Sequence, residues 1–441
     1  MIGIVVSEAD RASVTIGEQL LSLQEWEEVT AREDDIVARY RSGHFELCAF
    51  REMHLYVESV AEYFTNPTLI VFVSRHAGDT GPLLTAHYPG NIGRADFGGQ
   101  SFSLPQAAPL ALSKIMPSLR HYAPADFDVT IECTHHGPSD VGAPCLFVEV
   151  GSSEAEWSDP KPANAVAKAV LNLQFHDDWW SDRTVVGLGG NHYAPRFDRI
   201  VRETDWTVGH IAAEWSLEQL NDDERLQGVI QSMLENSNAS RILLDESTDR
   251  VTECAGAVGD AIVTETWLRE STGVSLDLVA QIEAKMGAID GGIRIGTITD
   301  ISPEDLAVKQ LHPDFVREIL AENAARAIKV VASHVVAYGT TENGNRLTGI
   351  IATAGKDGQE AVIRSLFPIL ENRYESVERE DEVLVVVESN FDPVRADDLG
   401  VPAGPEFGRL ANGEAITIDG QVISPDAVTE TVERKIPIWS S

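Results

Sequence analysis

The chain has 441 residues, 43% of them hydrophobic, so it can bury at least one sizeable core, and its length suggests two or three domains. It carries 70 acidic against 34 basic side chains, which gives a formal net charge of −36. Such a charge repels itself in a compact fold unless molar salt screens it, so we favour a salt-rich cytosol over a mesophilic protein with a cationic partner. No segment resembles a signal peptide or reaches about 18 consecutive apolar residues, which excludes a membrane helix and predicts a cytoplasmic location.

The first half of the chain alternates strand-like and helical segments. Residues 3–8 predict a buried strand and residues 12–23 a helix. Further apolar runs at 69–74, 145–150 and 184–188 predict strands that each end in a polar or glycine-containing loop. Such alternation is typical of an α/β fold, in which functional residues gather in the loops after the strands.

The histidine content divides the chain into two parts. Ten of the 12 histidines precede residue 211, and the helical pattern of residues 263–283 closes this first part. We therefore expect a first domain over residues 1–275 and a second, smaller α/β domain over residues 276–441. The second domain is predicted to contain an apolar segment at 329–338, a turn at 342–346, a helix at 359–374 and a strand at 383–389.

Three loops of the first domain carry polar groups that strand geometry does not require. The first holds Arg75, His76, His87 and Asn91; the second holds Glu132, His135, His136, Glu149 and Glu154; the third holds Asn191, His192 and Tyr193 after Gly189 and Gly190. Histidine and carboxylate side chains are the ligands of catalytic zinc, which lowers the pKa of a bound water to about 7. The two glycines allow the backbone to turn and approach a ligand closely.

Several of these residues also have ordinary structural explanations. A lone histidine after a strand is more often a hydrogen-bonded structural residue than a ligand. The adjacent His135 and His136 would point to opposite faces of an extended segment, so both reach one site only if the chain turns there, as Gly137-Pro138 permits. The spacing matches no HExxH motif, and the glycines do not form a dinucleotide fingerprint. On residue chemistry alone, a metal-dependent hydrolase is one of several open interpretations.

Three long segments resemble a known family. SRHAGDTGPLLTAHYPGN, ECTHHGPSDVGAPCLFVEVGSSEAEW and GLGGNHYAPRF, in this order, resemble the archaeal and plant type of D-aminoacyl-tRNA deacylase, over roughly residues 1–269. The resemblance implies a mixed-sheet α/β core similar to peptidyl-tRNA hydrolase and phosphorylase folds. It also implies a zinc enzyme, with two ions per subunit, that hydrolyses the ester of D-aminoacyl-tRNA and releases the D-amino acid and the tRNA. We expect a monomer.

The same resemblance suggests roles for individual residues. The expected zinc ligands are His87, His135, His136, Glu149 and His192. The expected catalytic residues are His76, His135, His136 and Glu149, with Glu149 or a non-ligand histidine as the general base. The expected substrate-binding residues are Arg75, Asn91, Gly189, Gly190, Asn191 and Tyr193. Which histidines bind zinc and which transfer protons stays open.

Alternatives remain for the function and for the C-terminal region. The same residues would suit a zinc amidohydrolase or peptidase of small molecules, or a tRNA-binding module in which the histidines are structural. A metal-free mechanism would use Asn91 or Asn191 together with a histidine. Residues 400–428 resemble a stretch of tRNase Z, but the HxHxDH metal motif of that family is absent, so a nuclease is not implied. We expect this segment to contact tRNA or to dock against another domain.

Overall fold

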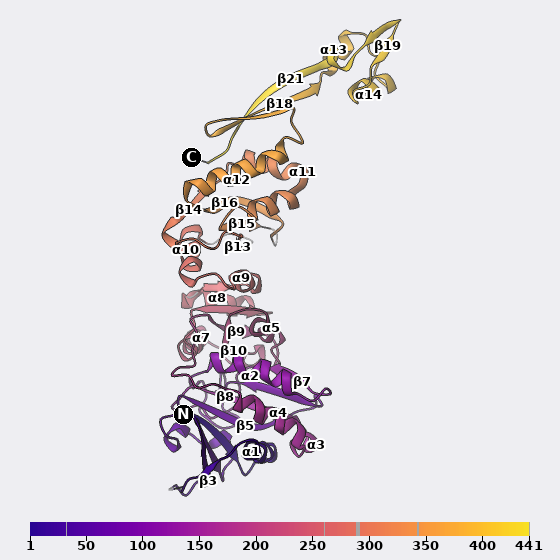
Figure 1. The fold of residues 1–441 in the computed structure, drawn as a ribbon. Coiled ribbons are helices and arrows are strands. Elements are labelled where there is room, and N and C mark those ends of the chain that lie inside the picture. The colour runs from indigo at the N-terminus through magenta and orange to yellow at the C-terminus, as the bar shows by residue number, and fades with distance from the viewer. Residues whose placement is uncertain (32, 260, 288–291, 342–343, 441) are drawn as a thin grey trace. The chain divides into compact units, whose positions relative to one another are not determined.

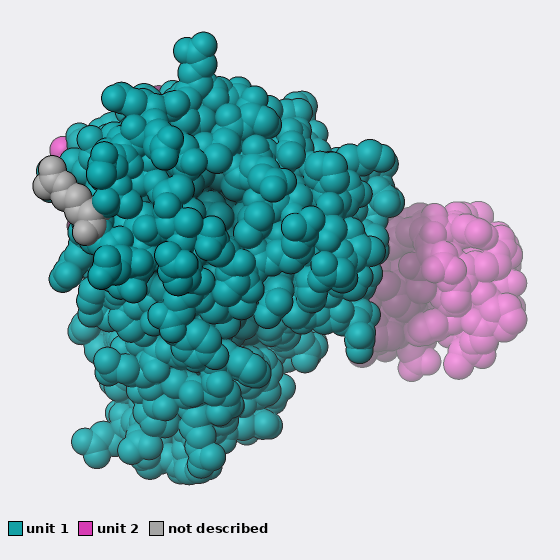
Figure 2. Space-filling view, turned by 90° about the horizontal axis from the view of Figure 1, so that it is seen from below, with its two compact units in different colours: residues 1–272 teal, residues 273–441 magenta. Residues whose placement is uncertain are grey.

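The computed structural model describes the chain except for residues 32, 260, 288–291, 342–343 and 441 (Figure 1). It forms two compact units, residues 1–272 and residues 273–441, which Figure 2 colours separately. Both units combine helices with sheets, which confirms the predicted α/β class. No helix among the described residues is long and apolar enough to cross a membrane.

The first unit contains an eight-stranded mixed sheet. Its order is β2-β3-β4-β1-β5-β8-β6-β7, in which β4, β1, β5 and β8 run parallel and β6 runs antiparallel to β8. Its strands are β1 Ile2–Ser7, β2 Glu27–Glu28, β3 Ile36–Ser42, β4 Phe45–Phe50, β5 Leu69–Ala77, β6 Leu83–His87, β7 Asp128–Ile131 and β8 Cys145–Ser152. The central strands β1, β5 and β8 are almost wholly buried, as continuous apolar runs in parallel sheets usually are.

A second, four-stranded parallel sheet completes the first unit. Its order is β10-β9-β11-β12, with β9 at Thr184–Gly189, β10 at Thr207–Ala212, β11 at Arg241–Asp245 and β12 at Ala261–Val263. The helices of this unit are α1 Arg11–Leu23, α2 Pro109–Tyr122, α3 Glu154–Trp157, α4 Pro160–Leu171, α5 Pro195–Glu203, α6 Glu214–Leu217, α7 Asp223–Ser237, α8 Asp249–Val258 and α9 Glu265–Glu270; the 3-10 turns are η1 His54–Tyr56 and η2 Val60–Tyr63.

Side-chain caps set the starts of several of these helices. The carboxylate of Asp10 accepts a hydrogen bond from the backbone N–H of Ser13 and so begins α1, where β1 ends. At the start of α3, Ser153 and Glu156 form a reciprocal capping box. Ser153 is therefore a helix-capping residue, whereas the hydroxyl of Ser152, the last residue of β8, donates to the carbonyl of Gly81 at 2.8 Å.

The second unit contains a four-stranded antiparallel sheet, β13-β15-β16-β14, with α11 and α12 packed on it (Figure 1). A three-stranded sheet, β17-β18-β21, continues the unit, and its long ribbon β18/β21 carries a small subdomain between its strands. The elements are α10 Leu276–Met286, β13 Ile293–Ile295, η3 Pro303–Asp305, β14 Leu306–Gln310, α11 Pro313–Ala332, β15 Ala337–Thr341, β16 Arg346–Ala354, α12 Gly355–Leu370, β17 Ser376–Glu380, β18 Val383–Phe391, α13 Pro393–Asp398, α14 Pro405–Ala411, β19 Ile416–Ile418, β20 Gln421–Ile423, η5 Pro425–Val428 and β21 Thr429–Pro437.

The structure corrects two element predictions. Residues 263–283 form two helices, α9 and α10, because the chain turns between them at Gly273, whose φ is +76°. The helix predicted at 359–374 lies at Gly355–Leu370, since Tyr374 is buried in the core of this unit instead of continuing the helix. The turn predicted at 342–346 falls partly on residues 342–343, which lie outside the described residues.

The segment at 400–428 lies in the small subdomain between β18 and β21. Its buried side chains Val401, Leu410 and Ile416 pack together with Ile423 and Val428 into a small core of their own. Its glycines and prolines therefore connect the elements of a folded subdomain.

Candidate active site

One face of the large sheet carries the polar cluster. Successive side chains of a strand point to opposite faces, so residues two apart share a face. On β5 these are Ser74 and His76, and Glu149 of β8 lies beside Ser74 in register. His87 of β6 lies opposite Phe147, two residues before Glu149. Ser74, His76, His87 and Glu149 therefore project from three adjacent strands onto the same face. His76 and His87 lie on strands instead of in the predicted loop, because β5 continues to Ala77 and the chain re-enters the sheet as β6.

The segment after β7 closes the cluster from the other side. The backbone N–H of Glu132 donates to Ala86 of β6 at 3.2 Å, that of Cys133 to His192 at 2.9 Å, and that of Thr134 to Ile211 of β10 at 2.8 Å. The segment thus runs from the large sheet to the small sheet, and its side chains lie between the two. This path brings His192, which follows β9, against Glu132.

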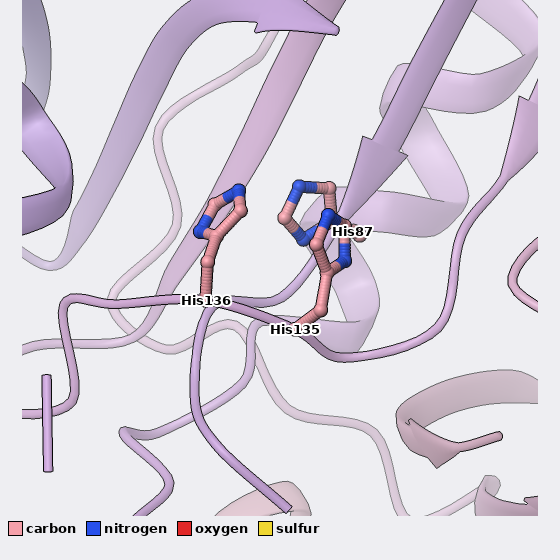
Figure 3. A group of neighbouring side chains, drawn as sticks. All are labelled: His87, His135 and His136. Carbon is pink, nitrogen blue, oxygen red and sulfur yellow. The ribbon is translucent and has the colours of Figure 1, made fainter. Parts of the chain in front are cut away.

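A left-handed residue turns both histidines of the pair toward the cluster. His136 has φ +46°, a conformation that residues other than glycine rarely adopt. The rings of His135 and His136 consequently lie close together, with centroids 4.4 Å apart, and both approach His87, at 4.1 Å and 4.9 Å (Figure 3). The structure therefore contains the turn that the sequence requires if both histidines are to serve one site.

The hydrogen bonds of these three rings prepare them to bind a metal. In each, Nδ1 lies within hydrogen-bond distance of a backbone carbonyl: Tyr88 for His87 at 3.0 Å, Cys133 for His135 at 2.8 Å and Gly137 for His136 at 2.8 Å. An Nδ1–H that donates to a carbonyl leaves the Nε2 lone pair free for a metal.

Two carboxylates lie among these imidazoles. Glu132 is 1% exposed, and its oxygens lie 2.9 Å from His76 Nδ1 and 3.3 Å from His192 Nε2. Glu149 is 2% exposed and lies 3.5 Å from Nε2 of His87, while its Oε1 accepts a hydrogen bond from the Ser74 hydroxyl at 2.7 Å. Both carboxylates face histidines across the centre of the cluster.

Several buried atoms of the cluster make no well-formed hydrogen bond within the described residues. They are Nε2 of His87 and both carboxylate oxygens of Glu132. Buried polar atoms normally have partners, so these atoms mark the place of a group that protein atoms do not supply. Four sets of residues could each hold an ion, with ligand atoms within 4.8 Å of one another: His87, His135 and His136; Cys133, His135 and His192; His76, Glu132 and His192; and His87, Glu132 and Glu149. The residues present therefore fit a zinc site, since nitrogen and oxygen ligands with a vacant position are typical of catalytic zinc.

The charges of the cluster depend on one another. Burial lowers the pKa of His76, but the carboxylates of Glu132 and Glu149 beside it outweigh burial and raise that pKa to about 11. Burial likewise opposes the positive form of His87, yet Glu149 raises its pKa above the ordinary value. The pKa of His135 lies well below its ordinary value, because the ring is buried among other histidines. The pKa of Glu149 lies well below its ordinary range despite burial, because histidines bond to it.

A pocket of about 240 Å³ opens onto the cluster. His135, His136 and His192 line this pocket, so it gives access from solvent to their imidazoles. The lining residues are Gly90, Asn91, Ile92, Gly93, Arg94, Asp96, Phe97, Thr134, His135, His136, His192, Trp215, Ser216 and Gln219.

The comparisons with known proteins agree with this site. A family model described as D-aminoacyl-tRNA deacylase matches residues 63–259, which include the whole cluster. A D-aminoacyl-tRNA deacylase of Haloquadratum walsbyi is 39% identical over 100% of this chain and 96% of its own length, and one of Halobacterium salinarum is 43% identical over 98% and 94%.

The chain belongs to the D-aminoacyl-tRNA deacylase family.

The predicted resemblance is thereby confirmed, and it extends beyond residue 269, because the relatives align over both units. A solved structure gives the same fold over a shorter length. The crystal structure of a conserved protein of unknown function is 31% identical, with a TM-score of 0.55, and covers 62% of this chain and 99% of its own.

The structure brings most of the predicted site residues of this family member together. His76, His87, His135, His136, Glu149 and His192 all belong to the cluster. Tyr193 joins it, since its hydroxyl lies 3.0 Å from His76 Nε2. Asn91 lines the pocket and holds the neighbouring loop, because its Nδ2 donates to Gly98 at 2.9 Å and to Gln100 at 3.2 Å.

Other predicted residues do not join the cluster. Arg75 projects to the opposite face of β5, where its guanidinium lies 5.3 Å from the ring centre of Trp157. Gly189 has φ +102°, and a Cβ there would come within 1.9 Å of the carbonyl oxygen of Asp245, so this glycine is required by packing. Gly190 and Asn191 line a separate open pocket together with Tyr193.

Glu132 is among the polar residues of the second predicted loop, but it received no catalytic, substrate-binding or zinc-binding role. It follows β7, a four-residue strand too short to recognise from its pattern, so nothing in the sequence marks it as buried. Its place in the second loop, three residues before His135, is the signal that marks it as a candidate. Cys133 also adjoins the site, with its sulfur 3.8 Å from His192 Nδ1.

Proposed function

We propose that this protein hydrolyses the ester bond of D-aminoacyl-tRNA and releases the free D-amino acid and the tRNA. One observation carries the proposal: a buried cluster of histidines and carboxylates opens into a pocket within a chain whose full-length relatives are named D-aminoacyl-tRNA deacylase. An aminoacyl ester is already activated, so its hydrolysis requires mainly positioning and stabilisation of the developing negative charge.

We assign zinc to this cluster. His87, His135 and His136 would hold one ion, since one nitrogen of each ring lies within 4.8 Å of the others and their Nδ1 atoms are already bonded to carbonyls. A second ion would be held by His76, Glu132 and His192, which supports a two-ion site. When bound, zinc supplies Lewis acidity toward the ester carbonyl and lowers the pKa of water.

The carboxylates and the remaining polar groups would move the protons. Glu149 faces the histidines, 3.5 Å from His87 Nε2, so its carboxylate is placed to accept the proton that the attacking water loses. The ribose oxygen that leaves needs a proton. His76 lies 3.0 Å from the Tyr193 hydroxyl, and this pair links the carboxylates to the loop after β9. The cluster can thus accept the proton that the attacking water loses and return a proton to the leaving ribose oxygen in each cycle.

The net charge of the chain and the sources of its relatives fit a protein that works in strong salt. The net charge of −36 disfavours ordinary phosphate contacts, and full-length relatives come from Haloquadratum walsbyi and Halobacterium salinarum. We propose a cytoplasmic monomer, with residues 276–441 contributing to tRNA contact or docking. The first unit contains the entire histidine cluster, which supports its assignment as the catalytic domain.

The decisive experiment compares D-tyrosyl-tRNA with L-tyrosyl-tRNA, with and without a chelator. D-selective hydrolysis that a chelator abolishes and zinc restores is the expected result. Alanine at His87, His135 or His136 should lower turnover at least tenfold and should also lower the zinc content, whereas alanine at His44 or His121, outside the cluster, should lower neither. Binding without turnover would indicate a tRNA-binding module. Hydrolysis of small amides but not of the tRNA ester would indicate an amidohydrolase.

A further inference from the structure

Two exposed aromatic side chains line the pocket that opens onto the histidines. Phe97 is 65% exposed, the most exposed aromatic side chain among the described residues, and Trp215 is 45% exposed. A single exposed apolar side chain needs no explanation. Two aromatic rings at the mouth of one pocket, beside His135 and His192, indicate a surface that a ligand covers.

The loop that carries Phe97 is fixed to the histidine loop. The carbonyl of Phe97 accepts a hydrogen bond from the N–H of Gly137 at 2.9 Å. The following glycines, Gly98 and Gly99, both have φ near +75°, and a Cβ on Gly98 would come within 2.1 Å of the carbonyl oxygen of Leu55. The backbone is therefore closely packed although the ring itself is exposed.

Trp215 has a similar setting on α6. The backbone N–H of Glu214 donates to Gly190 at 3.0 Å, and the neighbouring Ser216 and Leu217 are buried. The short helix is thus anchored beside the loop that carries His192. These contacts hold the backbone that carries each ring, so a ligand that the rings contact would lose little affinity to ordering of the protein backbone.

The charge of the pocket mouth indicates which part of the substrate these rings contact. Arg94 and Asp96 are both exposed there and offset each other, and the chain as a whole is strongly acidic. Contacts to phosphates would be weak and would weaken further as salt rises. Stacking of a base on an aromatic ring depends less on salt, and every base offers a face for it.

We propose that Phe97 and Trp215 form a stacking platform for the base of the terminal nucleotide of tRNA, whose ribose carries the scissile ester. The proposal rests on the proposed function, because it takes the pocket as the path of the aminoacyl end to the histidines. The platform positions the ester by its neighbouring base and requires no net positive charge on the protein.

The test combines protein and RNA changes. Phe97→Ala and Trp215→Ala should raise the KM for D-tyrosyl-tRNA by about 5- to 150-fold, with a smaller change in kcat, the range that stacking one base implies. Phe97→Tyr and Trp215→Phe should restore most of the loss. Phe175→Ala and Trp180→Ala are matched controls, since these rings are 44% and 37% exposed and do not line the pocket, and they should leave KM unchanged.

A second measurement identifies the group that is stacked. Short RNA hairpins with an unpaired 3′ end, with or without the terminal base, are titrated against the native protein and the alanine variants. The loss of affinity from removing the base and the loss of affinity from removing the ring should not add, because both changes remove the same contact. Additive losses, or a KM effect that follows the amino acid when D-tyrosine is replaced by D-alanine, would overturn the proposal. Native protein that hydrolyses no D-aminoacyl-tRNA would instead refute the proposed function.

Discussion

Glu132→Gln offers the sharpest test of the site geometry. The substitution keeps the size of the side chain but removes the negative charge of a carboxylate that is 1% exposed. That carboxylate lies 2.9 Å from His76 Nδ1, 3.3 Å from His192 Nε2 and 3.6 Å from His135 Nε2. No other described protein group makes a well-formed hydrogen bond to its oxygens, so its role concerns the histidines and whatever they hold.

The expected magnitude follows from these distances. The pKa of His76 is raised to about 11, so this ring carries a charge, and a pair of unit charges 2.9 Å apart interacts by about 6 kcal/mol at an effective dielectric constant of about 20. Desolvation of the carboxylate cancels part of this attraction. We therefore expect a net loss of about 1.4–2.7 kcal/mol, which corresponds to the 10- to 100-fold loss of metal affinity or activity typical of such partners.

The assay measures zinc content by elemental analysis and kcat/KM for D-tyrosyl-tRNA on the same preparation. Glu46→Gln is the matched control, because Glu46 is also fully buried but pairs with Arg39 and Arg41 outside the cluster. The control should lower the free energy of unfolding and leave zinc content and kcat/KM unchanged. A folded Glu132→Gln protein with full zinc and full activity would refute the assigned role of this carboxylate.

Three further predictions concern the rest of the chain. A protein ending at Thr272 should stay folded, since it contains one whole compact unit. It should keep D-selective hydrolysis of a small aminoacyl ester, measured by amino-acid release. A folded but inactive fragment would contradict the domain division. The carboxylate of Glu318 is buried, yet the hydroxyl of Tyr374 and the guanidinium of Arg434 hold its pKa below the ordinary value of 4.5. The ionised carboxylate therefore stabilises the fold above that value, and this contribution is lost as the pH falls through the lower pKa of the folded state. Glu318→Gln should be less stable than the native protein at pH 7. Its free energy of unfolding, measured by hydrogen exchange in α11, should fall less on acidification. Finally, the unfolding midpoint should rise steeply between 0.1 and about 2 M salt as self-repulsion is screened, and a protein equally stable at both would contradict the inference from charge.

The sequence predicted the elements that carry strong local patterns. The apolar runs of β1, β5, β8 and β9 are visible because strands buried on both faces contain few polar residues. The short β7 and the turn between α9 and α10 were not predicted, since four residues carry little periodicity and a single glycine interrupts a helical pattern only weakly.

By itself, the sequence determined the residue types of the site and the family to which they belong. A motif resemblance depends only on the order of residues along the chain. The histidine-containing segments supply that order without any information on which strands pair. Tertiary structure alone decided which of these residues meet. The alternation of side chains across three paired strands brings Ser74, His76, His87 and Glu149 onto one face and sends Arg75 to the other. The path of Glu132 between the two sheets depends on backbone hydrogen bonds to residues more than 40 positions away in sequence, and no local pattern encodes such contacts.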